Sequence, residues 1–102
     1  MSDRDTAAGR LNLWEAPAPR WTQEEAIAFA CARDYLAELQ AVYAAALDEL
    51  VAQPEPEIDH MMWLRSELEL IRQQRRDLTV HDQTAVAEIR ATVKARLEAL
   101  RR

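Results

Sequence analysis

Two groups of side chains have the types and spacing of metal ligands. Glu57 and His60 stand three positions apart, as do the Glu-x-x-His pairs of carboxylate-bridged metal bundles. Asp34 and Glu38 stand one helical turn apart, a spacing that suits acid and base roles or Mg²⁺ binding. A second Glu-x-x-His pair is missing along the chain, and the second predicted helix carries no second acidic pair at the spacing of Asp34 and Glu38. We therefore predict no metal site, no cofactor and no catalytic residues within one chain, and keep a metal-dependent hydrolase formed across a dimer as an alternative.

Most basic residues lie in the C-terminal part of the chain, where arginine's planar guanidinium suits phosphate binding. They are Arg65, Arg72, Arg75, Arg76, Arg90, Lys94, Arg96, Arg101 and Arg102. Glu69 and Glu98 lie within a helical turn of several of them, so local ion pairs use part of this charge. The sequence has no helix-turn-helix signature and no basic residues interleaved with aromatic ones. We name Arg72, Arg75 and Arg76 as possible anion-binding residues, with a nucleic-acid-associated regulator as a less favoured alternative.

A third group is apolar and suits contact with a protein. Met61, Met62 and Trp63 follow one another; methionine adapts to irregular surfaces, and tryptophan anchors interfaces. On a helix these residues spread apolar surface around a whole turn, which an N-terminal arm or a partner chain must cover. With Trp14 from that arm, they are the predicted partner-binding residues.

The composition of the chain favours helices. Its 102 residues include 19 alanines and one glycine, Gly9. Glycine supplies the positive φ angles of tight turns in sheets, and glycine-rich loops hold phosphates in several enzyme classes. The scarcity of glycine therefore predicts an all-α protein and excludes those phosphate-binding loops.

Charge and cysteine content limit the partners and the compartment. The net charge is −5, with twelve acids and four bases in residues 1–59 and six acids and nine bases in residues 60–102. These halves, at −8 and +3, are suited to pairing with each other. Cys31 is the only cysteine, which excludes a disulfide framework and favours the reducing cytoplasm. The longest apolar run is too short to span a membrane.

The N-terminal part of the chain is predicted to lack helices. Residues 1–10 are polar and are expected to be disordered. Pro17 and Pro19 favour an extended path for the apolar stretch that follows. We therefore predict a disordered tail and extended arm over residues 1–21, lying across a helical domain formed by residues 22–102.

The first helix is predicted from Gln23 to about Ala52. Thr22 and Glu25 form a capping-box pattern before it, and Pro54 follows it. Apolar residues then alternate spacings of three and four over three heptads, as in a coiled-coil seam. The seam consists of Phe29, Ala32, Leu36, Leu39, Tyr43, Ala46 and Leu50. Further apolar residues flank it, so this helix is expected to contact at least two neighbours.

Residues 57–102 contain no glycine or proline, yet the apolar stripe along them changes its helical phase. The β-branched pair Thr79 and Val80, with Asp82 as a capping residue, favours a break near residues 77–82. The alternative is one long helix with a stutter. We predict a three-helix antiparallel bundle in which the second and third helices pack antiparallel to the long central first helix.

These features predict a small cytoplasmic protein-protein interaction module rather than an enzyme. It would act as an adaptor, inhibitor or immunity-like protein that presents an acidic helical face and the Trp/Met patch. The first helix, at about 45 Å for roughly 30 residues, exceeds its neighbours in length. We therefore expect a homodimer, because pairing of two copies covers the surplus apolar length.

Overall fold

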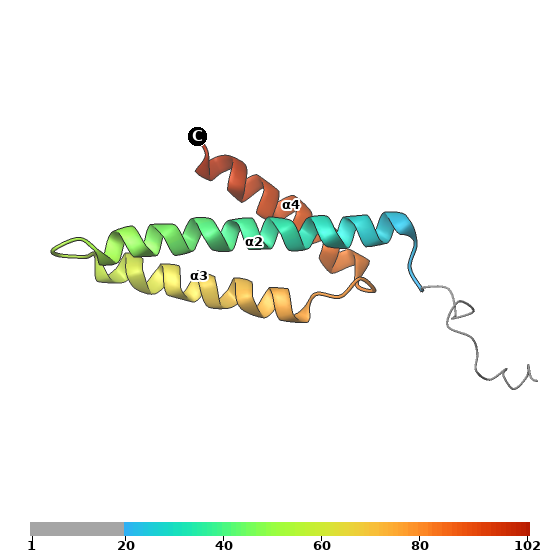
Figure 1. Ribbon diagram of the computed structural model, residues 1–102, viewed down its shortest axis with the longest axis horizontal. Coiled ribbons are helices and arrows are strands. Elements are labelled where there is room, and N and C mark those ends of the chain that lie inside the picture. The colour runs from blue at the N-terminus through green and yellow to red at the C-terminus, as the bar shows by residue number, and fades with distance from the viewer. Residues whose placement is uncertain (1–19) are drawn as a thin grey trace, which may run out of the picture.

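The computed structural model describes residues 20–102, which form three α-helices and no strand. Helix α2 spans Gln23–Val51, α3 spans Ile58–Asp77 and α4 spans Gln83–Leu100 (Figure 1). The prediction of an all-α chain is confirmed for this part of the protein. Most of the predicted tail and arm, including Trp14, lies outside the described residues.

Helix α2 begins with the predicted capping box. The Thr22 hydroxyl accepts a hydrogen bond from the Glu25 backbone N–H at 3.0 Å, and the Glu25 carboxylate accepts one from the Thr22 backbone N–H at 2.8 Å. These two bonds satisfy donors that no helical carbonyl reaches. The helix ends at Val51, one residue before the predicted end.

Replacing Thr22 with alanine is expected to lower the free energy of unfolding by about 1 kcal/mol, because the Glu25 N–H loses its acceptor. Urea unfolding followed by far-ultraviolet circular dichroism measures the change. Thr84 provides a matched Thr→Ala control, since it is exposed within α4, and its replacement should change stability by less than about 0.5 kcal/mol. Equal losses in the two variants would contradict a specific capping role.

One stripe of residues along α2 is buried in the core. Five of its seven predicted seam residues are buried, and Phe29 and Ala46 are partly buried against them. Ala32 and Leu36 have no exposed surface. Buried residues of α3 and α4 complete the same cluster, so one apolar core joins the three helices: Leu64, Leu68, Ile71, Val86, Ile89, Val93 and Leu97.

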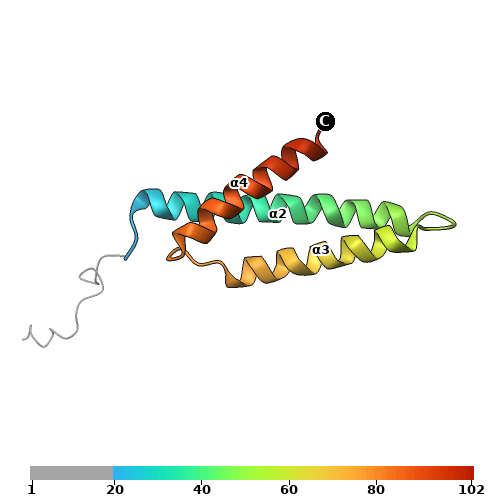
Figure 2. The same cartoon turned by 180° about the vertical axis from the view of Figure 1, so that it is seen from behind.

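The two shorter helices each pack on α2 but scarcely touch each other. Helix α3 runs antiparallel to α2, as predicted, whereas α4 runs in the same general direction as α2 and crosses it obliquely (Figures 1 and 2). The predicted antiparallel packing of the third helix is therefore wrong. A chain that reverses at two successive loops returns its third helix to the direction of the first.

The break between α3 and α4 lies where the phase of the apolar stripe changes. Leu78 has an extended backbone and is buried, and Asp82 caps α4 by accepting a hydrogen bond from the Ala85 backbone N–H at 3.1 Å. Trp21 packs edge-on against His81 of this loop, with 5.2 Å between ring centroids. Two separate helices are confirmed, and the alternative of one long helix is wrong.

Candidate binding surfaces

A groove of about 500 Å³ lies between the C-terminal half of α3 and the N-terminal half of α4. An adjoining hollow of about 160 Å³ reaches Leu39 of α2. We call both together the α3–α4 groove. The main part is lined by Leu70, Gln73, Gln74, Asp77, Leu78, Asp82, Ala85, Glu88, Ile89 and Thr92. The groove exists because α3 and α4 diverge from their connecting loop while both rest on α2 (Figure 2).

The α3 wall of the main groove has one exposed apolar residue, Leu70, beside the polar Gln73, Gln74 and Asp77. Leu70 remains 51% exposed, although it lines both parts of the groove. Trp63 lies seven residues earlier, on the same side of α3 by helical periodicity, and is 47% exposed. Its ring meets Tyr43 of α2 edge-on, with centroids 5.6 Å apart. Trp63 and Leu70 are therefore two exposed apolar residues, two helical turns apart, on one side of α3.

The predicted Trp/Met patch is divided by the helix. Met61 is partly buried and packs against the core. Met62 is 60% exposed and lies about a quarter turn around α3 from Trp63 and Leu70 by helical periodicity. Of the predicted partner-binding residues in the described part, Trp63 lies on the same side of α3 as Leu70, and none lines the groove itself. The sequence did not indicate Leu70 as a binding residue, because it lies outside the buried stripe of α3. It lines the groove only because α4 diverges from α3.

Acidic side chains surround the end of the groove nearest the connecting loop. Asp77, Asp82 and Glu88 line it, and no basic residue lines this main part. One of these carboxylates, that of Asp82, also caps α4. The groove therefore combines a few apolar contacts, Leu70, Leu78 and Ile89, with a negative rim.

An arginine at the other end of the groove links the three helices. The Arg96 guanidinium of α4 donates hydrogen bonds to the Tyr43 hydroxyl of α2 at 3.3 Å and to the Glu67 carboxylate of α3 at 2.9 Å. Its hydrogen bond to Tyr43 is the main cause that raises the pKa of Arg96, against an opposing effect of burial, and Glu67 adds to the rise. Arg96 therefore stays cationic. The sequence placed it among the basic residues without indicating this role.

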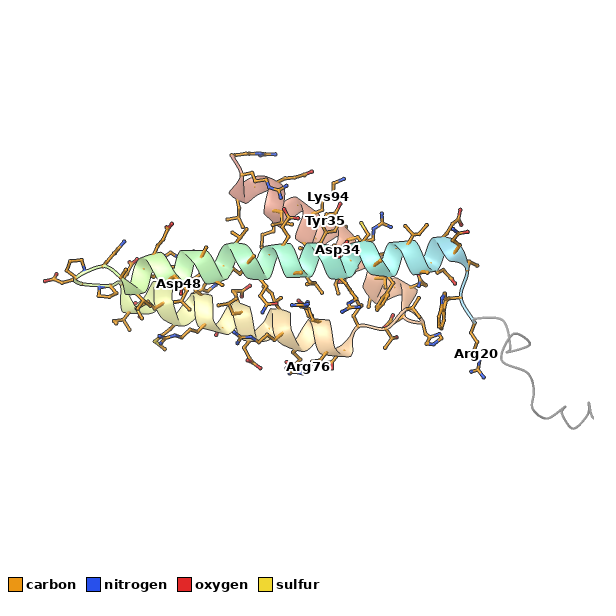
Figure 3. The ribbon with its side chains drawn as sticks, viewed as in Figure 1. Arg20, Asp34, Tyr35, Asp48, Arg76 and Lys94 are labelled. Atoms are coloured by element: carbon orange, nitrogen blue, oxygen red, sulfur yellow. The ribbon has the colours of Figure 1, made fainter. Side chains whose placement is uncertain are left out.

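A second hollow, shallow and largely open to solvent, has a volume of about 320 Å³ and is lined by four arginines. Arg72, Arg75 and Arg76 come from α3, as the sequence suggested, and Arg33 joins them from α2. Figure 3 shows Arg76 on the side of α3 away from α4, so this surface is separate from the groove. We call these four residues the arginine cluster.

The candidate metal ligands do not meet within one chain. The Glu57 carboxylate lies 4.0 Å from the His60 imidazole at the start of α3. Asp34 is exposed on α2 (Figure 3), and Glu38 forms an ion pair with Arg101. Residues 20–102 contain no group of three or more histidine, cysteine, aspartate or glutamate side chains that could hold a metal ion. A site shared by two copies stays an untested alternative.

The described part of the chain is thus a three-helix protein with one open groove between helices and one basic surface. Comparison with models of protein families, with curated proteins and with solved structures finds no match. Within residues 20–102, no helix combines the length and the apolar character needed to cross a membrane.

Proposed function

We propose that this protein is a small protein-binding module, of the adaptor, inhibitor or immunity type, that receives a helix of its partner in the α3–α4 groove. The observation that carries the proposal is the open interface: α3 and α4 both pack on α2 but hardly on each other. In a closed three-helix bundle, each helix covers the other two. Here a further helix could take the uncovered position.

The chemistry of the groove defines the partner helix. Leu70 in the groove and Trp63, two helical turns before it on the same side of α3, offer apolar contacts at a spacing that matches the anchors of an amphipathic helix. The carboxylates of Asp77, Asp82 and Glu88 favour lysine or arginine beside that apolar stripe. The net charge of −5 adds a general attraction for a cationic partner. We therefore assign the groove to a basic amphipathic helix.

The direct test uses two synthetic helical peptides that share one apolar stripe. One carries lysine at its flanking positions and the other carries glutamate. We expect the lysine peptide to bind and to shift the amide resonances of residues around Leu70, Ile89 and Thr92, while the glutamate peptide does not. Binding that is equal for both peptides, or shifts centred elsewhere, would overturn the assignment.

Leu70→Ala is the matching variant. Because this substitution removes an apolar anchor, we expect it to lower the affinity for the lysine peptide about tenfold, equivalent to about 1.4 kcal/mol of binding free energy. Met62→Ala serves as the control, because Met62 is an exposed apolar residue of the same helix that does not line the groove; it should leave the affinity unchanged. Isothermal titration calorimetry gives both values. Equal effects of the two substitutions would place the contact outside the groove.

The expected homodimer is tested on the same samples. Light scattering at micromolar concentration should give the mass of two chains if copies pair through apolar surface outside the groove. A dimer that Leu70→Ala dissociates would assign the groove to a second copy and remove the partner helix from the proposal. A mass of one chain would contradict the expectation of a homodimer.

A further inference from the structure

The arginine cluster brings together four like charges from two helices. Arg33 and Gln40 lie two turns apart on α2, and both face α3: Arg33 lines the hollow with the α3 arginines, and Gln40 accepts a hydrogen bond from Arg75 at 2.6 Å. Arg72 and Arg76 complete the lining. Bringing four guanidinium groups to one hollow carries an electrostatic cost unless an anion offsets it.

Carboxylates within residues 20–102 offset only part of this charge. Glu69 lies 3.6 Å from Arg72 and 3.9 Å from Arg76. Arg75 has the neutral Gln40 as its hydrogen-bond partner, and Arg33 lies over the Phe29 ring at 5.8 Å. Among the described ion pairs, neither Arg33 nor Arg75 has a carboxylate within 4.0 Å. The cluster therefore retains a strong positive charge.

The position of Arg33 distinguishes a binding site from ordinary helix stabilisation. Arg75 and Arg76 lie in the last turn of α3, where cations stabilise the negative end of the helix dipole. That explanation does not extend to Arg33, which lies well inside α2. Its contact with Phe29 and the bond between Arg75 and Gln40 hold two of the four side chains in place before any ligand arrives. Such ordering reduces the entropy lost on binding.

We propose that the arginine cluster binds a compact polyphosphate group. The hollow is lined by arginines alone, so its ligand is small, hydrophilic and highly charged, and guanidinium forks bind phosphate oxygens in pairs. An extended nucleic acid requires a longer basic track, whereas this chain carries a net charge of −5. The phosphate chain is recognised either as inorganic polyphosphate or as part of a nucleotide.

The test titrates the full chain with inorganic tripolyphosphate at low ionic strength by calorimetry. We expect one molecule bound per chain, with an affinity that falls as salt rises, and Arg33→Gln should weaken it at least tenfold. Arg65→Gln is the matched control, because it removes the same charge from an exposed position of α3 that does not line the hollow. Circular dichroism verifies that both variants remain folded.

Further titrations separate the possible sources of phosphate. Equal affinities for tripolyphosphate and ATP identify the phosphate chain as the recognised group, and tighter binding of ATP identifies a nucleotide. Both outcomes support the proposal if Arg33→Gln weakens the binding at least tenfold. The proposal is overturned by absence of binding, by equal effects of Arg33→Gln and Arg65→Gln, or by duplex DNA that competes better than tripolyphosphate at equal phosphate concentration.

Discussion

Replacing Leu36 with alanine is expected to lower the free energy of unfolding by about 3 kcal/mol, within the range of about 2–5 kcal/mol for such truncations in a core. Leu36 has no exposed surface and lies in the cluster that joins the three helices. Its truncation removes apolar contacts and leaves a cavity that a rigid α2 cannot close. Urea unfolding measures the loss, and the thermal midpoint should fall by about 10–25 °C.

Ile27→Ala is the control for this prediction. Ile27 lies on the same helix but is 61% exposed, so its truncation should cost less than about 1 kcal/mol. If the two variants lost the same stability, the seam of α2 would not be the centre of the core. Retained helical signal in Leu36→Ala before denaturant is added would show that the comparison concerns folded chains.

Replacing Arg96 with alanine is expected to destabilise the chain by about 1–2 kcal/mol. The substitution removes hydrogen bonds to the Tyr43 hydroxyl and to the Glu67 carboxylate, and hydrogen bonds to charged groups contribute about 1.5–3 kcal/mol. The lower value applies because Arg96 is half exposed, so solvent screens it. Glu67 is only 19% exposed and would be left without its cationic partner.

A double-mutant cycle with Glu67→Gln isolates the ion pair. We expect the two substitutions together to cost about 0.5–1 kcal/mol less than the sum of the single effects. Arg90→Ala controls for loss of charge on α4, because Arg90 is exposed and does not line the groove. Strict additivity in the cycle would show that Arg96 and Glu67 act independently.

The helices could be predicted from the sequence because local signals specify them. The capping pair Thr22 and Glu25 set the start of α2, and the prolines that follow it set its end within one residue. The change of phase after Leu78 separated α3 from α4. The direction and crossing of α4 could not be predicted, because they depend on how two helices share one face of α2 rather than on any local pattern.

The binding surfaces were predicted less completely for the same reason. Arg72, Arg75 and Arg76 are neighbours in sequence and could be grouped directly, whereas Arg33 joins them only through the register of α2 against α3. Trp63 was identified by its residue type. Leu70 could not be identified, since a leucine outside the buried stripe is assigned to a binding surface only when the neighbouring helix is known to diverge.

The separation of α3 from α4 also determines how the chain opens. Each helix has its own interface with α2, so we expect α4 to open more readily than the α2–α3 hairpin, with the Arg96–Glu67 bond as the described side-chain link to α3 that it must break. A partner helix seated between α3 and α4 would contact α4 and the hairpin at once. Binding would therefore convert two loosely coupled units into one cooperative unit, with the partner stabilising the whole fold in proportion to its affinity.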